Sequence, residues 1–256
     1  MSLDQGAKDV HAFLKTFSHS VFPNLAGRPW HVTGESMGGH YVTGYTKHIA
    51  SQEEPGINIS SAIIVDGYID ATRQFIGYYD FFCEDWARDG RKAPLMKDLA
   101  CKDMRDAIPE CEKMAKKCRE VHDIATCKAA NEVCEEGIGE HFVDGVVRGG
   151  WDPYDSEFFD PSSCLLLTRK GRHPCEEPPM CSNLDHGPTW TFLNKRWVQE
   201  KLGFKHHPFD LIDLDTNERW DRAENIHIPV TRELTWILDS TNISVLFING
   251  NNDIIM

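Results

Sequence analysis

The chain has 256 residues, a formal net charge of −13, and a composition that is 41% hydrophobic and 26% charged, as in a globular domain with a sizeable core. The acidic balance argues against nucleic acid or an anionic membrane surface as a partner. The sequence contains no run of about 18 apolar residues, so we expect no transmembrane helix. The polar stretch Met1–Asp9 contains no apolar segment, so we expect no signal peptide.

The first predicted elements surround a short motif. Residues 7–22 place apolar side chains at helical spacing and predict an amphipathic helix that ends before Pro23. Residues 30–33 then predict a strand, and residues 41–50 predict a helix. The segment Gly34-Glu35-Ser36-Met37-Gly38 between them fits G-x-S-x-G, the nucleophile elbow of α/β-hydrolases, in which a serine occupies a sharp turn from strand to helix.

The glycines of this segment are expected to permit close packing. Gly34 and Gly38 should allow the tight contacts that the turn needs, and Gly39 should keep the start of the helix close to the strand. A bare G-x-S-x-G match is common by chance, so the flanking strand and helix are what make this match more specific.

Later segments continue the alternation of strands and helices. Residues 57–65 form a continuous apolar run, which is typical of a strand buried in a parallel sheet. Residues 230–238 predict a helix, and residues 244–248 predict another buried strand. Three parallel strands that alternate with helices indicate an α/β fold, with active-site residues at the C-terminal ends of the strands.

Four of the nine cysteines have a spacing that suggests a cross-linked helical hairpin. Cys111 and Cys118 are seven residues apart, as are Cys127 and Cys134, so each pair lies on one face of its helix. If the chain folds back near residues 122–123, Cys118 faces Cys127 and Cys111 faces Cys134. Two nested disulfides are one interpretation; a metal site, which the absence of C-x₂-C spacing disfavours, and reduced thiols are the others. Disulfides would indicate an oxidising compartment.

The longer string from Thr33 to Val42 carries a more specific signal. It resembles the serine carboxypeptidases, the family of yeast carboxypeptidase Y, which shows G-E-S-Y-G/A-G-H-Y at its nucleophile; Met37 stands where the family usually has tyrosine. The resemblance extends along most of the chain, with insertions. The segment 66–70 loosely matches the family's G-N-G-x-x-D-P, with aspartate where asparagine is usual, and residues 192–203 resemble a helix that lines the substrate cleft.

The resemblance implies an α/β-hydrolase core, with a mostly parallel sheet, that is interrupted by a disulfide-rich helical cap insertion. The core, incomplete in this sequence, would comprise residues 1–73 and 191–256, and the cap would comprise residues 74–190. The nested cysteine pattern resembles the family's cap. By this resemblance, a further bridge Cys83–Cys101 would tie the hairpin to its base, and a bridge Cys175–Cys181 would close a small loop. Cys164 would be a free thiol or pair outside the chain.

The resemblance also implies a catalytic triad with Ser36 as nucleophile. Asp253 follows the last predicted strand and resembles the family's triad aspartate in Y-A-G-D-x-D-F; an ordinary turn residue is the alternative. The triad histidine should follow the aspartate in sequence, but all 12 histidines precede Asp253. We therefore expect the base not to be encoded in these residues. We expect His40 to pack or hydrogen-bond locally, and nothing supports His186 or His227 as the base.

Residues next to Ser36 acquire roles from the same resemblance. The backbone N–H of Met37 would be one oxyanion donor; the second comes in the family from an upstream N-G-G-P-G-C-S-S loop, which residues 1–29 do not contain. Glu35 and Gly34 would contribute to substrate binding. In the family this glutamate pairs with a second carboxyl group to bind the terminal carboxylate of the peptide, whereas the alternative is an ordinary exposed glutamate near a helix start.

We therefore expect a serine-type carboxypeptidase polypeptide that is truncated at both ends. Its complete relative would release C-terminal residues from peptides through an acyl-enzyme on Ser36, and the chain as written should be catalytically very weak or inactive. One alternative is an acyltransferase that moves acyl groups from sugar esters to alcohols. Another is a non-catalytic, decayed or truncated peptide-binding product.

The expected partners are the C-termini of peptides or proteins, with no cofactor and no metal, and the sequence does not indicate an oligomeric state. The resemblance and the cysteines together predict a vacuole-like or lysosome-like lumen, or secretion. Two sequons, at Asn58 and Asn242, are candidate glycosylation sites beside predicted strands.

Overall fold

The computed structural model describes residues 2–84, 96–142, 151–152, 154–159, 187–204, 207–210, 215–216, 219 and 225–255. Its α-helices are α1 (Leu3–Thr16), α2 (Gly38–Ala50), α3 (Ala71–Tyr79), α4 (Asp98–Val121), α5 (Ile124–Cys134), α6 (Glu140–Phe142), α8 (Gly187–Leu193), α9 (Arg196–Leu202) and α11 (Thr231–Ser240). Shorter helical turns are η1 (Phe17–Val21), η2 (Pro23–Leu25), η3 (Asp80–Glu84), η4 (Glu135–Gly139) and η6 (Asn225–His227). The strands are β1 (Pro29–Ser36), β2 (Asn58–Gly67), β3 (Trp151–Asp152), β4 (Asp155–Phe159) and β5 (Ser244–Ile248).

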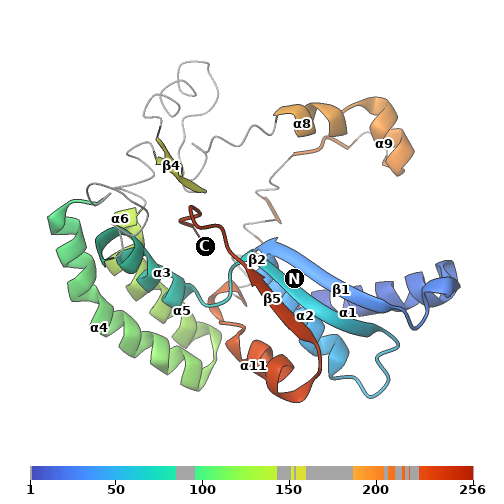
Figure 1. Ribbon diagram of the computed structural model, residues 1–256, viewed down its shortest axis with the longest axis horizontal. Helices are drawn as coiled ribbons and strands as arrows, with labels where there is room; N and C mark the ends of the chain where they lie inside the picture. The colour runs from blue at the N-terminus through green and yellow to red at the C-terminus, as the bar shows by residue number, and fades with distance from the viewer. Residues whose placement is uncertain are drawn as a thin grey trace.

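The central feature is a parallel sheet in the order β1-β2-β5 (Figure 1). β2 is the middle strand: its Val65 is aligned with Glu35 of β1 on one side and with Ile248 of β5 on the other. All three strands therefore end at the same edge of the sheet. The predicted α/β fold with a partial parallel sheet is confirmed.

Helix α2 covers one face of this sheet and is buried because its apolar side faces the strands. Val42 of α2 packs with Ala62 and Ile64 of β2, and Ile49 packs with Ile57 and Ile59. Helices α1 and α11 in turn contact α2. No helix in the described part of the chain is both long enough and apolar enough to cross a bilayer.

Strand β5 differs from the expectation that it is buried. Leu246, Phe247 and Ile248 are 49%, 46% and 47% exposed. Within the described residues β5 pairs only with β2, so it lies at an edge of the sheet. The continuous apolar run predicts a strand with both faces covered, but it does not indicate which segment covers them.

The first helix also differs from its expected bounds. α1 begins at Leu3, because Ser2 caps it by accepting a hydrogen bond from the backbone N–H of Gln5. It ends at Thr16, and η1 continues to Val21 as a wider helical turn. Of the apolar residues that define the predicted stripe, Phe13 and Val21 are 61% and 57% exposed, so the stripe is only partly covered in the described structure.

The cysteine hairpin forms as its spacing predicts. α4 and α5 are antiparallel neighbours joined at His122, a residue with left-handed backbone, and α3 contacts both helices of this hairpin (Figure 1). Disulfides join Cys118 to Cys127 and Cys111 to Cys134, and a third bridge joins Cys83 to Cys101. These three predicted bridges are confirmed.

The other predictions for the cysteines and the cleft helix have different outcomes. Cys164, Cys175 and Cys181 lie outside the described residues. The segment expected to form one helix over 192–203 instead forms the end of α8 and all of α9. These helices are separated at Asn194, whose amide donates to Phe209 O and whose carbonyl accepts from Phe209 N–H.

Candidate active site

The turn between β1 and α2 has the geometry of a nucleophile elbow. β1 ends at Ser36, α2 begins at Gly38, and Met37 is the N-cap residue between them. Ser36 has a φ of 56°, in the left-handed region that non-glycine residues rarely adopt. Such a conformation costs about 1–3 kcal/mol and persists only where the surroundings enforce it, which is most often at functional sites.

Two glycines make this tight turn possible, as the sequence predicts. A Cβ on Gly34 would lie 2.9 Å from a methyl group of Val42 and 3.0 Å from the Cα of Gly38. A Cβ on Gly39 would lie 2.6 Å from Tyr68 O and 3.0 Å from the carbonyl carbon of Gly67. All four distances are shorter than a normal van der Waals contact. α2 can therefore approach the strands only because Gly34 and Gly39 have no side chain.

Gly38 does not behave as predicted. A Cβ built on it would meet no atom within 4 Å, so packing does not require glycine there. The expected need for tight packing applies instead to the Cα of Gly38, which faces Gly34 across the turn.

Ser36 is fixed to the neighbouring strand. Its carbonyl oxygen accepts a hydrogen bond of 2.8 Å from Tyr68 N–H, and Ser36 is aligned with Gly67 at the end of β2. The ladder skips one residue here, because Glu35 is aligned with Val65. Asp66 is therefore the extra residue of a β-bulge beside the serine.

Asp253 lies in the turn that follows β5. Asp253 Oδ1 accepts from Ile255 N–H at 2.9 Å, and the N–H of Gly250 in the same turn donates to Asp66 Oδ1 at 2.7 Å. Ser36 and Asp253 thus follow strands on opposite sides of β2 at the same edge of the sheet. This is the edge where the sequence predicts the site.

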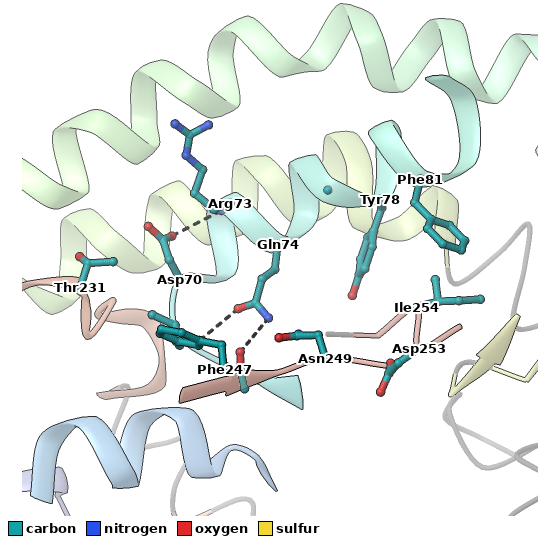
Figure 2. Close-up of a pocket in the computed structure, with 13 residues that line it drawn as sticks. Asp70, Arg73, Gln74, Tyr78, Phe81, Thr231, Phe247, Asn249, Asp253 and Ile254 are labelled. Carbon is teal, nitrogen blue, oxygen red and sulfur yellow. Dashed lines mark hydrogen bonds between the residues drawn. The ribbon is translucent and has the colours of Figure 1, made fainter. Parts of the chain in front are cut away.

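A cavity of about 550 Å³ opens at this edge (Figure 2). Its lining includes Gly67 and residues of the β2–α3 connection, α3, η3, α11, β5 and the turn after β5: Ile69, Asp70, Arg73, Gln74, Tyr78, Phe81, Thr231, Phe247, Asn249, Asp253 and Ile254. Gly67, the residue aligned with Ser36, and Asp253 both line the cavity, whereas Glu35, Ser36 and Met37 are not among its lining residues. Its volume is that of a small-ligand pocket.

Two side chains of α3 stabilise the cavity wall. Gln74 accepts from Ile69 N–H at 3.1 Å and donates to Gly67 O at 3.3 Å. The phenol of Tyr78 donates to Ile255 O at 3.1 Å, next to the Asp253 turn. Burial, with a smaller contribution from the Asp253 carboxylate, raises the pKa of Tyr78 above its ordinary value, so the phenol stays protonated and remains a donor.

The cavity wall is linked to the helical hairpin through Asp70. The carboxylate of Asp70, which lines the cavity, caps α3 and accepts from the Thr72 hydroxyl. Its second oxygen lies 3.4 Å from Arg119 of α4. In this ion pair, which connects the cavity wall to the hairpin, the Asp70 side chain is 9% exposed and the Arg119 side chain is 34% exposed.

His40 is occupied by structural contacts, as expected. Its Nδ1 lies 2.6 Å from Tyr68 O and its Nε2 lies 3.1 Å from Ile228 O. Burial lowers the pKa of His40 below its ordinary value, and the two carbonyl groups oppose this effect only in part. His227 lies in η6, where its Nδ1 is 3.0 Å from the Asn131 amide nitrogen, and His186 lies outside the described residues.

Glu35 and Ser36 are exposed, and Met37 is half-buried. Met37 is the N-cap of α2, where the first backbone N–H groups of a helix have no partner within that helix. Among the described residues no group of three or more His, Cys, Asp or Glu side chains could hold a metal ion. This edge of the sheet carries Ser36, the carboxyl groups of Glu35, Asp66 and Asp253, and the backbone N–H groups at the start of α2.

The family model for serine carboxypeptidases matches residues 1–256. The chain belongs to the serine carboxypeptidase family. Carboxypeptidase Y homolog A of Talaromyces marneffei is 28% identical over 250 residues, which are 97% of this chain and 40% of that protein. The homolog A of Talaromyces stipitatus is 27% identical over 215 residues, which are 84% of this chain and 34% of that protein. The chain therefore spans well under half the length of these serine carboxypeptidase relatives.

A solved structure shows the same fold. Kex1(delta)p, a prohormone-processing carboxypeptidase from Saccharomyces cerevisiae, superimposes with a TM-score of 0.66 at 17% identity. The match covers 100% of this chain and 50% of that one. The α/β-hydrolase fold of the serine carboxypeptidases is thus shared by the part of the protein described here.

Proposed function

We propose that this chain supplies the nucleophile and the triad carboxylate of a serine carboxypeptidase that removes C-terminal residues from peptides. The observation that carries the proposal is the left-handed conformation of Ser36 at the β1–α2 turn, in a chain of this family. The position of Asp253, at the same sheet edge and across β2 from the serine, supports the pairing. Gln74 and Tyr78 were not recognised from the sequence, and their contacts suggest that they shape the pocket.

The chemistry follows from these positions. Ser36 Oγ would attack the carbonyl carbon of the scissile amide while an imidazole accepts the hydroxyl proton. The N–H of Met37 would donate to the oxyanion, which is the electrostatic part of the catalysis. As the C–N bond breaks, the imidazolium returns a proton to the departing amine, and water then hydrolyses the ester on Ser36. Asp253 would orient the imidazole, and no histidine of these 256 residues is assigned as that base.

Glu35 is proposed to help recognise the terminal carboxylate of the substrate. It precedes the nucleophile and is exposed at the same turn. A carboxyl group can bind an anion only when it carries or shares a proton, as one of two neighbouring carboxyl groups can. Gly34 contributes by allowing the tight turn in which the side chains of Glu35 and Ser36 are exposed.

The disulfides and the exposed sequon asparagines support an oxidising location. Three bridges occur among the described cysteines, and Asn58 and Asn242 are both exposed. Bridges persist in the secretory pathway and outside the cell, where glutathione and thioredoxin do not reduce them. We therefore propose a vacuole-like or lysosome-like lumen, or secretion, with glycosylation at these sequons.

The test is labelling of the chain with a fluorophosphonate, which phosphonylates an activated serine. Imidazole is added because no encoded histidine is assigned as the base. We expect imidazole to accelerate labelling, a peptide map to place the adduct on Ser36, and Ser36→Ala to remove it. Labelling of the S36A variant at the wild-type rate, or no imidazole-dependent labelling of the wild type, would refute the assignment.

A competition experiment tests the carboxypeptidase specificity separately. A blocked dipeptide with a free C-terminus should slow the labelling of Ser36, and the corresponding C-terminal amide should not. Glu35→Ala should remove this difference while leaving uncompeted labelling within about twofold, because Glu35 does not act on the serine. Equal protection by the acid and the amide in the wild type would contradict the proposed substrate class.

A further inference from the structure

One side chain connects the strand beside the nucleophile to the turn that carries Asp253. Asp66 lies between Val65 and Gly67, the last two residues of β2 that are aligned with β1, and its Oδ1 accepts from Gly250 N–H at 2.7 Å. The two residues are 184 positions apart in sequence. The distance is typical of a strong hydrogen bond between a carboxylate and an N–H group.

The backbone around Asp66 is built for this contact. Because Glu35 is aligned with Val65 and Ser36 with Gly67, Asp66 is unpaired in that ladder, and its φ of 40° lies in the left-handed region. A bulge with such a residue changes the direction of one side chain relative to the regular alternation of the strand. Aspartate tolerates this conformation better than most residues, because its short polar side chain forms local hydrogen bonds.

Gly250 is close to both carboxyl-bearing side chains. A Cβ built on Gly250 would lie 3.4 Å from the Cβ of Asp253 and 3.8 Å from Asp66 Oδ1. Asp253 N–H in turn lies 3.4 Å from Gly250 O. A shift of the Gly250 peptide would therefore move Asp253.

The other end of the same turn is held independently. Tyr78 donates to Ile255 O, two residues beyond Asp253, and Figure 2 shows Tyr78 above the segment of Asn249, Asp253 and Ile254. The turn is thus fixed by α3 on one side of Asp253 and by Asp66 on the other. Of these two contacts, only the one through Asp66 originates beside Ser36.

We propose that Asp66 is a positioning residue, which sets the placement of the Asp253 carboxylate relative to Ser36 by holding the Gly250 N–H. The proposal rests on the proposed function, because it assigns Asp66 to the pairing of Ser36 with Asp253. The carboxylate acts through the turn and does not contact the reacting atoms. Because Asp66 lies in the bulge of β2, the distance between Ser36 and Asp253 depends on the end of this strand, which separates them.

Two variants separate the hydrogen bond from the backbone conformation. Asp66→Gly keeps the left-handed φ accessible and removes the acceptor, whereas Asp66→Asn keeps an acceptor oxygen in the same place. Both are made in the full chain, and far-UV circular dichroism with hydrogen exchange of the β2 amides verifies the fold. We measure exchange of the Gly250 amide and the imidazole-dependent rate of fluorophosphonate labelling at Ser36.

We expect D66G to exchange Gly250 about tenfold faster and to label Ser36 about tenfold more slowly, as the loss of a charge-assisted hydrogen bond implies. D66N should restore both quantities to within about twofold of the wild type. Equal labelling of D66G and the wild type would overturn the positioning role, even if Gly250 exchange increases. Absence of wild-type labelling together with faster Gly250 exchange in D66G would instead refute the proposed function and leave the hydrogen bond established.

Discussion

Two adjacent glycines at the start of α2 should respond in opposite ways to the same substitution. In Gly39→Ala the new methyl group would lie 2.6 Å from Tyr68 O, 2.8 Å from Tyr68 N and 3.0 Å from the carbonyl carbon of Gly67. All three atoms belong to the backbone, so no side-chain rotation relieves the contact. The start of α2 must move away from β2 instead.

The size of the effect follows from the geometry. Overpacking against rigid neighbours costs about 1–3 kcal/mol, and we place G39A at the upper end because the three contacts are simultaneous. Gly38→Ala meets no atom within 4 Å, and alanine is favoured over glycine in a helix and less flexible in the unfolded chain, which gives a gain of up to about 0.5 kcal/mol. The two variants should therefore differ in unfolding free energy by about 3 kcal/mol.

Urea unfolding of the wild type, G38A and G39A measures this difference directly. We expect the midpoint of G39A to fall at an unchanged m-value, and that of G38A to equal or exceed the wild-type midpoint. In a thermal scan the difference corresponds to roughly 5–10 °C for a domain of this size. Equal midpoints for G38A and G39A would show that α2 does not approach the end of β2 as closely as described.

The remaining predictions concern the hairpin and the buried histidine. Replacing Cys118 and Cys127 together with serine should lower the free energy of unfolding by about 2–3 kcal/mol, because a short loop is no longer closed in the unfolded chain; an unchanged urea midpoint would contradict this. Arg119→Met should cost about 1–2 kcal/mol because it leaves the carboxylate of Asp70 nearly buried without its cation, whereas the R119K variant should retain most of the wild-type stability in the same urea experiment. Since burial lowers the pKa of His40 in the folded protein, the unfolded chain binds a proton first as the pH falls below about 6.5, and stability should decrease there by up to about 1.4 kcal/mol per pH unit. His40→Gln should reduce this slope between pH 7 and pH 5, and an identical slope would refute the contribution of His40.

Local patterns predicted the parts of the fold that depend on local geometry. The seven-residue spacing of the cysteines on α4 and α5 favoured the two nested bridges that the structure shows, because two helical turns return to the same face. The G-x-S-x-G segment located the elbow, and the left-handed φ of Ser36 is the conformation that this motif requires. The continuous apolar run of β2 marked a central strand correctly.

The sequence was less informative where a feature depends on distant segments. The apolar run of β5 predicts burial, but Leu246, Phe247 and Ile248 are exposed in the described structure. Gly38 belongs to the motif, yet a Cβ at this position would have open space around it. Matching a motif shows that glycine is present, but it does not show whether a larger side chain would fit there. Asp66 and Tyr78 contact the Asp253 turn across 184 and 177 positions of the sequence, and no local pattern marks such contacts.

In the proposed function, Ser36 and Asp253 face one imidazole ring. The most direct measurement compares the imidazole dependence of Ser36 phosphonylation in the wild type and in Asp253→Asn, a substitution of nearly equal size. We predict that D253N lowers the imidazole-dependent rate by at least about tenfold, because an amide neither orients the ring nor stabilises its protonated form as a carboxylate does. Identical imidazole dependence in the two proteins would contradict the account.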